Sequence, residues 1–380
     1  MPVLVAVVSC ALLAVVLWDA FEAIVLPRRV TRRLRLTRLF YRYTWLAWSA
    51  VGRRMRPGKQ REKYLSYYGP LSLLLLLSVW ALSLIVGFAM LQWALGSAMS
   101  APEGTATFGT DLYMSGTTFF TLGLGDVIPR TRLARALTVV EAGTGFGFLA
   151  LVIGYLPVLY QAFSQREVII SLLDARAGSP PRAAELLRRH GQGYMEELGQ
   201  LLRDWERWSA ELLESHLSYP VLGYYRSQHD NQSWLAALTT ILDASALVIV
   251  GIDGGPARQA LLTFAMARHA VVDLAQIFNT PPRAPEPDRL PPADLGRLRE
   301  GLAAAGVQLN DASGADRKLA DLRRMYEPYV NALADYLCVT LPLWTATAGT
   351  IDNWQTSAWE RISTGTAASP LSAAHRDEHF

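Results

Sequence analysis

The sequence has few charged residues for its length and only two cysteines. Charged side chains make up 18% of its 380 residues, whereas soluble chains carry about 25%, and residues 64–102 contain none. The two cysteines, Cys10 and Cys338, lie far apart, so a disulfide framework and a cysteine metal site within one chain are excluded. Lysine is rare beside abundant arginine and alanine, which indicates a GC-rich bacterial gene. These shortages exclude disorder and a single soluble core, and they predict a bacterial membrane protein.

Three long apolar runs predict three transmembrane helices. They cover residues 2–26, 70–96 and 133–163, and each is long enough to cross the roughly 30 Å hydrocarbon core of a bilayer. The first run carries Asp19 and Glu22 near its end, and we expect both carboxylates to lie near one face of the helix. A secretory signal peptide is disfavoured, because the run has no basic start and no small-residue cleavage site.

The orientation of these helices follows from the positions of the basic residues. Residues 28–63 hold thirteen Arg or Lys against one Glu, and basic residues in short flanking loops stay in the cytoplasm. This segment is therefore predicted to be cytosolic. The N-terminus is then outside, residues 97–132 are external, and everything after about residue 166 is cytosolic.

The basic segment is predicted to form a helix on the membrane surface, not a further span. Arginines fall on every third position from Arg29 to Arg38, a pattern that resembles a voltage-sensing helix. Seven arginines lie between residues 28 and 42, however, and their insertion would cost on the order of 20 kcal/mol. We expect a basic interfacial helix over 28–66, with anionic lipid as the partner of 28–63. Because this charge lies beside apolar runs, nucleic acid is not an expected partner.

The external loop between the second and third apolar runs is unusually apolar in its middle, residues 109–129. Asp111 or Thr110 is a suitable cap for a short helix that runs through Phe120. The C-terminal end of such a helix carries a partial negative charge, which favours a cation beside it. The loop is therefore predicted to re-enter the membrane and to present a cation site after Phe120.

The residues after this short helix have the composition of an ion-selectivity filter. A potassium ion sheds its water only where other oxygens replace it, and an extended backbone with its carbonyls turned to one axis supplies them. Such a backbone requires unusual angles at alternate residues, which Gly123 and Gly125 adopt at low cost. Leu122 is expected to point into surrounding protein. The predicted K⁺ ligands are the backbone carbonyls of Thr121, Leu122, Gly123 and Leu124 and the Thr121 hydroxyl.

The pattern Thr118-x-x-Thr121-Leu-Gly-Leu-Gly-Asp126 resembles the selectivity signature of potassium channels, and its Gly-Leu-Gly-Asp form is similar to the second pore loop of two-pore-domain potassium channels. The resemblance covers about residues 68–165. It implies a filter at 121–125, supported by Thr118 and by a hydrogen bond from Tyr113 to Asp126. Leu124 stands where most of the family has a bracing Tyr. A poorly selective cation channel is therefore an alternative.

Several residues in the third apolar run are candidates for a gating hinge. Glycine and proline weaken a helix, which suits a pore-lining helix that bends to open. Close packing of helices is an equally good explanation of the glycines. The resemblance implies a hinge near Gly145 and an inner gate near Pro157. Glu141 is expected to pair with an arginine of residues 130–135. The candidate hinge residues are Gly143, Gly145, Gly147 and Pro157.

The rest of the chain has helical periodicity and few strand signals. The stretch 248–255 lacks the G-x-G-x-x-G spacing of a nucleotide site, and 234–252 is predicted to be a buried helix, not a fourth span. No metal site is indicated by four histidines that have no shared short spacing, His190, His216, His229 and His269. The predicted organisation is an N-terminal transmembrane helix at 1–27, a basic helix at 28–66, a pore domain at 67–166, a linker at 167–181, helices at 182–278, a proline-rich linker at 279–293, helices at 294–360 and a disordered tail at 361–380.

Together these patterns predict an all-α membrane protein with three transmembrane helices, a re-entrant pore helix and filter, and an all-α cytosolic domain. The predicted function is that of a potassium-selective channel subunit in a bacterial inner membrane. A filter with four sides needs four loops, so a homotetramer is expected. No catalytic residues and no cofactor apart from permeant potassium are predicted. A membrane-anchored helical sensor or scaffold with a non-conducting pore is a further alternative.

Overall fold

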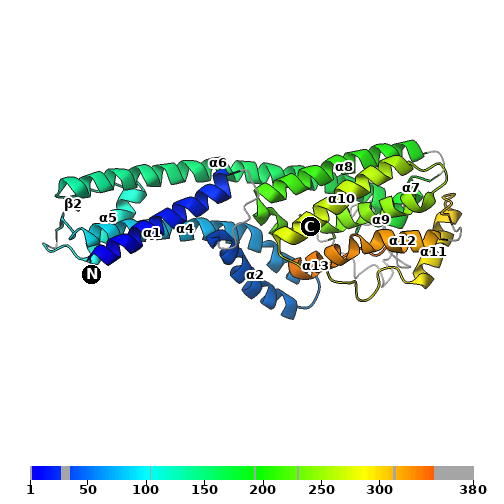
Figure 1. Cartoon of the computed structure of the whole chain (residues 1–380), viewed down its shortest axis with the longest axis horizontal. Helices are drawn as coiled ribbons and strands as arrows, with labels where there is room; N and C mark the ends of the chain where they lie inside the picture. Colours follow the sequence, from blue (N-terminus) through cyan, green and yellow to red (C-terminus); the bar gives the residue numbers. More distant parts are fainter. Residues whose placement is uncertain are drawn as a thin grey trace, which may run out of the picture. The chain divides into compact units, whose positions relative to one another are not determined.

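The computed structural model describes residues 2–26, 35–102, 104–191, 194–228, 231–310 and 314–345. It consists of two units (Figure 1). Unit 1 is formed by 1–50 and 67–161, and unit 2 by 51–66 and 162–380. The described elements are helices apart from one short two-stranded ribbon, and helices long and apolar enough to cross a membrane are present. The prediction of an all-α membrane protein is confirmed. Predictions for 28–34, 346–360 and 361–380 lie outside the described residues.

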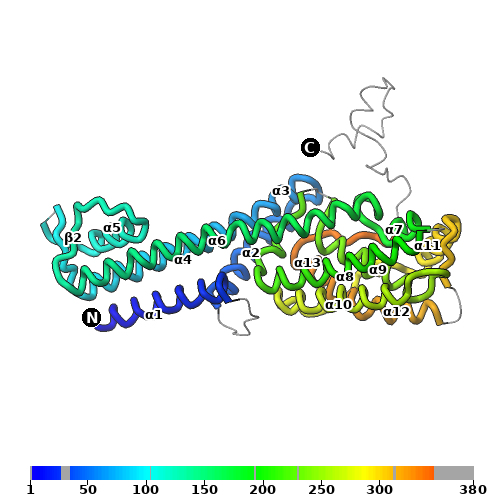
Figure 2. The backbone as a smooth tube through the Cα atoms, turned by 90° about the horizontal axis from the view of Figure 1, so that it is seen from above, coloured from blue at the N-terminus to red at the C-terminus, as the bar shows by residue number. Residues whose placement is uncertain are grey.

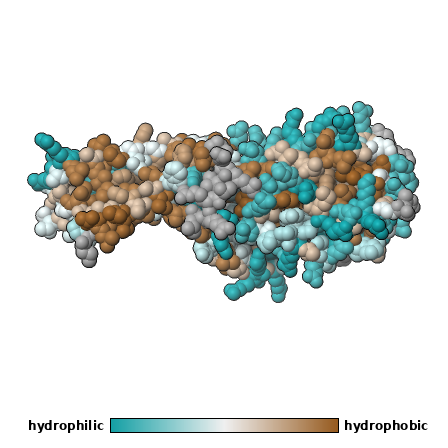
Figure 3. Space-filling view, viewed as in Figure 1, coloured by the Kyte–Doolittle hydropathy of each residue, from teal (hydrophilic) through white to brown (hydrophobic). Residues whose placement is uncertain are grey.

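Unit 1 is built from long apolar helices. α1 (Pro2–Ala20) continues as a short π-helix, η1 (Phe21–Val25), and packs along α4 (Tyr68–Ala94). Gly87 of α4 permits this approach, since a Cβ there would lie 2.7 Å from Leu13 Cδ2. Apolar residues dominate the surface of this unit in Figure 3, as expected for segments that face lipid.

The two acids of the first helix have polar partners, as burial of a charge requires. Asp19 is buried, and its Oδ2 accepts a hydrogen bond from Trp80 Nε1 at 3.1 Å and another from the backbone N–H of Thr37 at 3.1 Å. Glu22 accepts from Trp18 Nε1 at 2.7 Å and pairs with Arg35 at 3.3 Å. These contacts join α1 to α4 and to the start of the basic region.

The prediction of one basic helix over 28–66 is wrong. The described part contains two helices, α2 (Leu36–Arg54) and α3 (Lys59–Ser66). Pro57 cannot donate a helical hydrogen bond, and Gly58 has a φ of +147°, so the chain turns between them. Part of the aromatic side of α2 faces protein, since Trp45 stacks edge-on against Tyr68 at 4.7 Å between ring centroids.

Unit 2 is a helical domain around a buried central helix. α9 (Trp234–Gly251) lies beside α10 (Ala257–Ile277), which also packs on α8 (Met195–Ser218) (Figure 2). By length and composition α9 and α10 are also candidate spans, but 94% of the α9 window is buried inside the protein. This burial agrees with the predicted buried helix. The surrounding elements are α7 (Ala183–Arg189), η2 (Pro220–Tyr224), α11 (Pro292–Ala304), α12 (Ala315–Arg324) and α13 (Glu327–Leu337).

Both predicted linkers differ from the structure. α6 (Arg132–Ala177) continues through most of 167–181, because its apolar side buries Ile170 and Leu173 and it ends only at Gly178, which has a φ of +82°. The proline-rich segment 279–293 contains no helix before Pro292, but it is packed into the domain, with Leu290 buried. It therefore joins the helices on either side into one unit.

Arg166 anchors the distal part of α6 in the helical domain. Its buried guanidinium donates to the carbonyls of Leu222 and Tyr225, both at 2.9 Å, and Trp208 Nε1 donates to the Arg166 carbonyl at 3.3 Å. His216 Nε2 lies 3.3 Å from Arg166 Nη1. Burial and then the charge of Arg166 lower the pKa of His216 to about 3. His216 is therefore neutral at physiological pH, so that no second positive charge is buried beside Arg166.

Candidate functional site

The external loop of unit 1 contains the short helix expected there, α5 (Phe108–Phe119). Its cap is Thr107, not Asp111 or Thr110. The Thr107 side chain accepts from the Thr110 N–H at 3.4 Å, and the Thr110 hydroxyl accepts from the Thr107 N–H at 3.1 Å, which completes a capping box. Asp111 is buried and instead accepts from Ser97 Oγ at 2.5 Å. Reciprocal Thr–Thr capping has no strong sequence signature, so the start of the helix was misplaced.

A small ribbon closes the loop that contains α5. β1 (Met99–Ser100) pairs antiparallel with β2 (Ile128–Pro129), and the Arg130 N–H donates to the Ala98 carbonyl at 2.7 Å. The pairing brings the two ends of the loop together. The residues between α5 and β2 are thus fixed at both ends.

The segment after α5 has positive φ at alternate residues. Thr121, Gly123 and Gly125 have positive φ values of 56°, 56° and 79°. The sequence indicated the two glycines, but it did not indicate Thr121, because a β-branched residue rarely adopts this region. Thr121 is held by its N–H, which donates to the Thr118 carbonyl at 3.0 Å, and the Leu122 N–H donates to the Thr117 carbonyl at 2.8 Å. A strained residue fixed in this way is typical of a functional site.

The side chains of this segment are not covered within one chain. Leu122 and Leu124 are 60% and 62% exposed, so Leu122 does not point into surrounding protein of its own chain as expected. Both apolar side chains are therefore exposed in the single chain.

The site residues Tyr113 and Asp126, far apart in the loop, lie side by side. The Tyr113 hydroxyl donates to Asp126 Oδ2 at 2.8 Å. This bond connects the middle of α5 to the residue that follows Gly125.

Gly145 of α6 lies directly against the end of α5. A Cβ at Gly145 would lie 2.1 Å from the carbonyl oxygen of Phe119, whereas a Cβ at Gly143 or Gly147 would meet nothing within 4 Å. Of the two explanations left open by the sequence, this contact favours packing at Gly145. Gly143 and Gly147 are not required for packing within the chain.

A model of the family described as "ion channel" matches residues 74–161. These residues are therefore similar to an ion-channel domain. The match covers most of α4, all of α5, residues 121–126 and the first part of α6. Every site residue singled out in the sequence lies within it.

One curated relative is similar over a longer part of the chain. An uncharacterized membrane protein of Bacillus subtilis, YdjJ, is 23% identical over 266 residues, which are 69% of this chain and 76% of the relative. No solved structure matches the chain. The comparisons therefore support an ion channel in a membrane, and they point to transport, not catalysis.

The sequence does not indicate one buried polar contact of α5. Ser115 of α5 and Glu141 of α6 are both buried and hydrogen-bonded to each other, and Ser115 Oγ also donates to the Ile85 carbonyl of α4 at 2.7 Å. The expectation that Glu141 pairs with an arginine of 130–135 is wrong. Three helices of the ion-channel domain meet at this hydroxyl, and only their packing reveals it.

The contact between Tyr113 and Asp126 leads to a first prediction. Tyr113→Phe and Asp126→Asn each remove or weaken a charge-assisted hydrogen bond that holds the residue after Gly125 to α5. We expect both variants to lose ion selectivity or to inactivate faster, and the double variant to be no worse than the more severe single variant. The measurement is the reversal potential and current decay in planar bilayers. If Tyr113→Phe behaves as the unchanged protein while Asp126→Asn lowers conductance only at low salt, Asp126 acts as a surface charge instead.

Proposed function

We propose that this protein is the subunit of a potassium-selective channel. The observation that supports this most strongly is the alternation of positive φ at Thr121, Gly123 and Gly125 directly after α5. Alternation of this kind turns successive carbonyls toward one side, where they replace the water around a dehydrated cation. The proposed ligands are the carbonyls of 121–124 and the Thr121 hydroxyl, with Thr118, Tyr113 and Asp126 in support. No cofactor is proposed apart from the permeant ion.

The proposed working unit is a homotetramer. Carbonyls from one chain lie on one side of an ion only, so several copies have to surround it, and identical subunits close most readily into a cyclic assembly. The exposed Leu122 and Leu124 side chains support this, because neighbouring copies around a shared axis would cover them.

The proposed location is a bacterial inner membrane with the N-terminus outside and the helical domain in the cytosol. The support is the positive charge of 28–63, which favours the cytosolic side. Tyr43 and Leu46 of α2 are exposed beside this charge, which suits contact with anionic lipid. Nucleic acid is not proposed as a partner.

Opening is proposed to involve bending of α6. Gly143 and Gly147 have open space around them, and Pro157 interrupts the hydrogen bonding inside the helix. Gly145 is proposed to hold the end of α5 while neighbouring positions bend.

A poorly selective cation channel is the second candidate. The observation that favours it is Leu124, an exposed apolar side chain at a filter position where it donates no hydrogen bond. A filter without such bracing adapts more easily to ions of another size.

Ion flux from the purified full-length protein in liposomes tests the proposal. We expect potassium efflux that sodium does not support, and a native mass of four chains in mild detergent. Gly125→Ala adds a Cβ where φ is +79°, so its flux should fall by at least about tenfold while assembly is retained. Gly301→Ala, in the ordinary helix α11 with open space, is the matched control. Equal sodium and potassium flux would favour the second candidate, and absence of flux or a monomeric particle would contradict both.

A further inference from the structure

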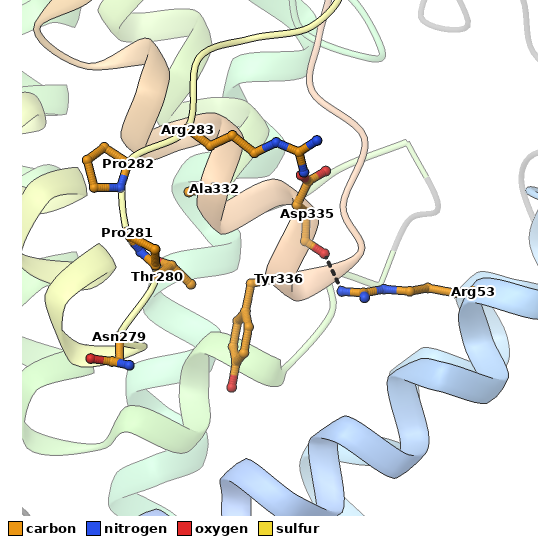
Figure 4. Close-up of a pocket in the computed structure, with 9 residues that line it drawn as sticks. All are labelled: Arg53, Asn279, Thr280, Pro281, Pro282, Arg283, Ala332, Asp335 and Tyr336. Carbon is orange, nitrogen blue, oxygen red and sulfur yellow. Dashed lines mark hydrogen bonds and ion pairs between the residues drawn. The ribbon is translucent and has the colours of Figure 1, made fainter.

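The helical domain contains a cleft of about 720 Å³ that the channel function does not use (Figure 4). Three segments of unit 2 form it: the last turn of α2, the chain after α10, and α13. Small-molecule sites commonly have volumes of about 300–1,000 Å³. The cleft is lined by Arg53, Asn279, Thr280, Pro281, Pro282, Arg283, Ala332, Asp335 and Tyr336.

Two arginines give this cleft a positive charge that is only partly balanced. Arg53 donates to the backbone carbonyl of Asp335 at 2.9 Å, and within the described residues no carboxylate pairs with it. Arg283 pairs with the Asp335 carboxylate at 2.6 Å, but the two side chains are 65% and 53% exposed. An ion pair exposed to this extent is weak, so Arg283 can readily leave Asp335 for another anionic partner. The cleft therefore has two guanidinium groups for one carboxylate.

The walls of the cleft are preformed. Arg283 N–H donates to the Pro328 carbonyl at 2.9 Å, and Asn331 Nδ2 donates to the Ala284 carbonyl at 3.1 Å, which holds the proline-rich segment along α13. The Tyr336 hydroxyl is 2.8 Å from that of Tyr224. Figure 4 shows the Tyr336 side chain between Thr280 and Arg53 in this view. A ligand would meet a rigid, largely apolar wall beside the arginines.

We propose that this cleft binds a small organic phosphate. The planar forks of Arg53 and Arg283 match phosphate oxygens, and Tyr336, Pro281 and Pro282 would contact the organic part of the ligand. When the phosphate binds, it replaces the Asp335 carbonyl as the partner of Arg53 and the Asp335 carboxylate as the partner of Arg283. The phosphate belongs either to a free metabolite or to a phospholipid headgroup, because both present the same group to the arginines.

Titration of the full-length protein in detergent with phenyl phosphate tests this site. We expect saturable binding that is tighter than that of inorganic phosphate or phenol. Arg53→Gln and Arg283→Gln should each weaken it about tenfold or more. Asp335→Asn should strengthen it, because it removes the carboxylate that competes for Arg283 while leaving the backbone carbonyl in place. Arg54→Gln, an exposed neighbour outside the cleft, should not change it.

The source of the phosphate is distinguished in nanodiscs. Phenyl phosphate binding that is present in a phosphate-free detergent but lost in phosphatidylglycerol and in phosphatidylcholine nanodiscs identifies a lipid headgroup as the occupant, whereas equal binding in detergent and in nanodiscs identifies a free phosphate. The site is refuted if phenyl phosphate does not saturate, if both arginine variants bind it as well as Arg54→Gln does, or if Asp335→Asn weakens it. Melting temperatures of all variants show whether each is folded. The result does not depend on which ion the pore conducts.

Discussion

Replacement of Gly145 by alanine should displace the end of α5 and abolish conduction. The added Cβ would lie 2.1 Å from the Phe119 carbonyl oxygen and 2.8 Å from its carbonyl carbon, and these are backbone atoms that cannot rotate away. Overpacking in a closely packed site costs about 1–3 kcal/mol. Because Thr121 and Leu122 are hydrogen-bonded to the last turn of α5, movement of this turn also moves residues 121–125, the proposed filter.

Hydrogen exchange of the α5 amides, together with potassium flux, measures this effect. We expect faster exchange over α5 and at least a tenfold loss of flux in Gly145→Ala. Gly143→Ala lies two residues away on α6 with nothing within 4 Å of the new Cβ, so it should leave α5 exchange unchanged. Loss of flux with full protection of α5 would assign Gly145 to hinge bending and not to packing.

Replacement of Arg289 by methionine should destabilise the helical domain more than any surface change. The Arg289 guanidinium lies 2.5 Å from Asp243 and 3.2 Å from Glu327, and the three side chains are 8%, 1% and 4% exposed. Burial opposes the charge of Arg289, but Asp243 and Glu327 outweigh it and raise the pKa of Arg289 above its usual value. Removing one partner of a buried ion pair costs about 3–5 kcal/mol, because the remaining charge stays buried.

Thermal unfolding of the full-length protein, followed by tryptophan fluorescence, measures this loss. Arg297→Met is the control, because Arg297 forms an ion pair with Asp294 in which the side chains are 69% and 33% exposed. Such a pair contributes about 0–1 kcal/mol. Adding Asp243→Asn to Arg289→Met should recover part of the stability, since it removes the uncompensated charge. Equal melting temperatures for Arg289→Met and Arg297→Met would show that the buried cluster does not stabilise the domain.

The sequence by itself determined the features that depend only on residues close together in the chain. Long apolar runs predicted the helices that are long enough to span a membrane, because the bilayer sets their length and composition. The glycines at 123 and 125 predicted positive φ, since only the absence of a Cβ makes that region easy. Periodicity predicted the helices of the second unit. All of these properties are local, so they can be read from a single chain segment.

Tertiary structure alone decided the features that depend on residues distant in the sequence. The Phe119 carbonyl distinguishes Gly145 from Gly143 and Gly147, although the three glycines look alike in the sequence. Arg289 appears in a proline-rich stretch as an ordinary linker residue, yet Asp243, 46 positions away, makes it part of the core. Whether such a residue belongs to the core depends on the residue that it contacts on another helix. Packing brings the two residues together, and no local pattern encodes it.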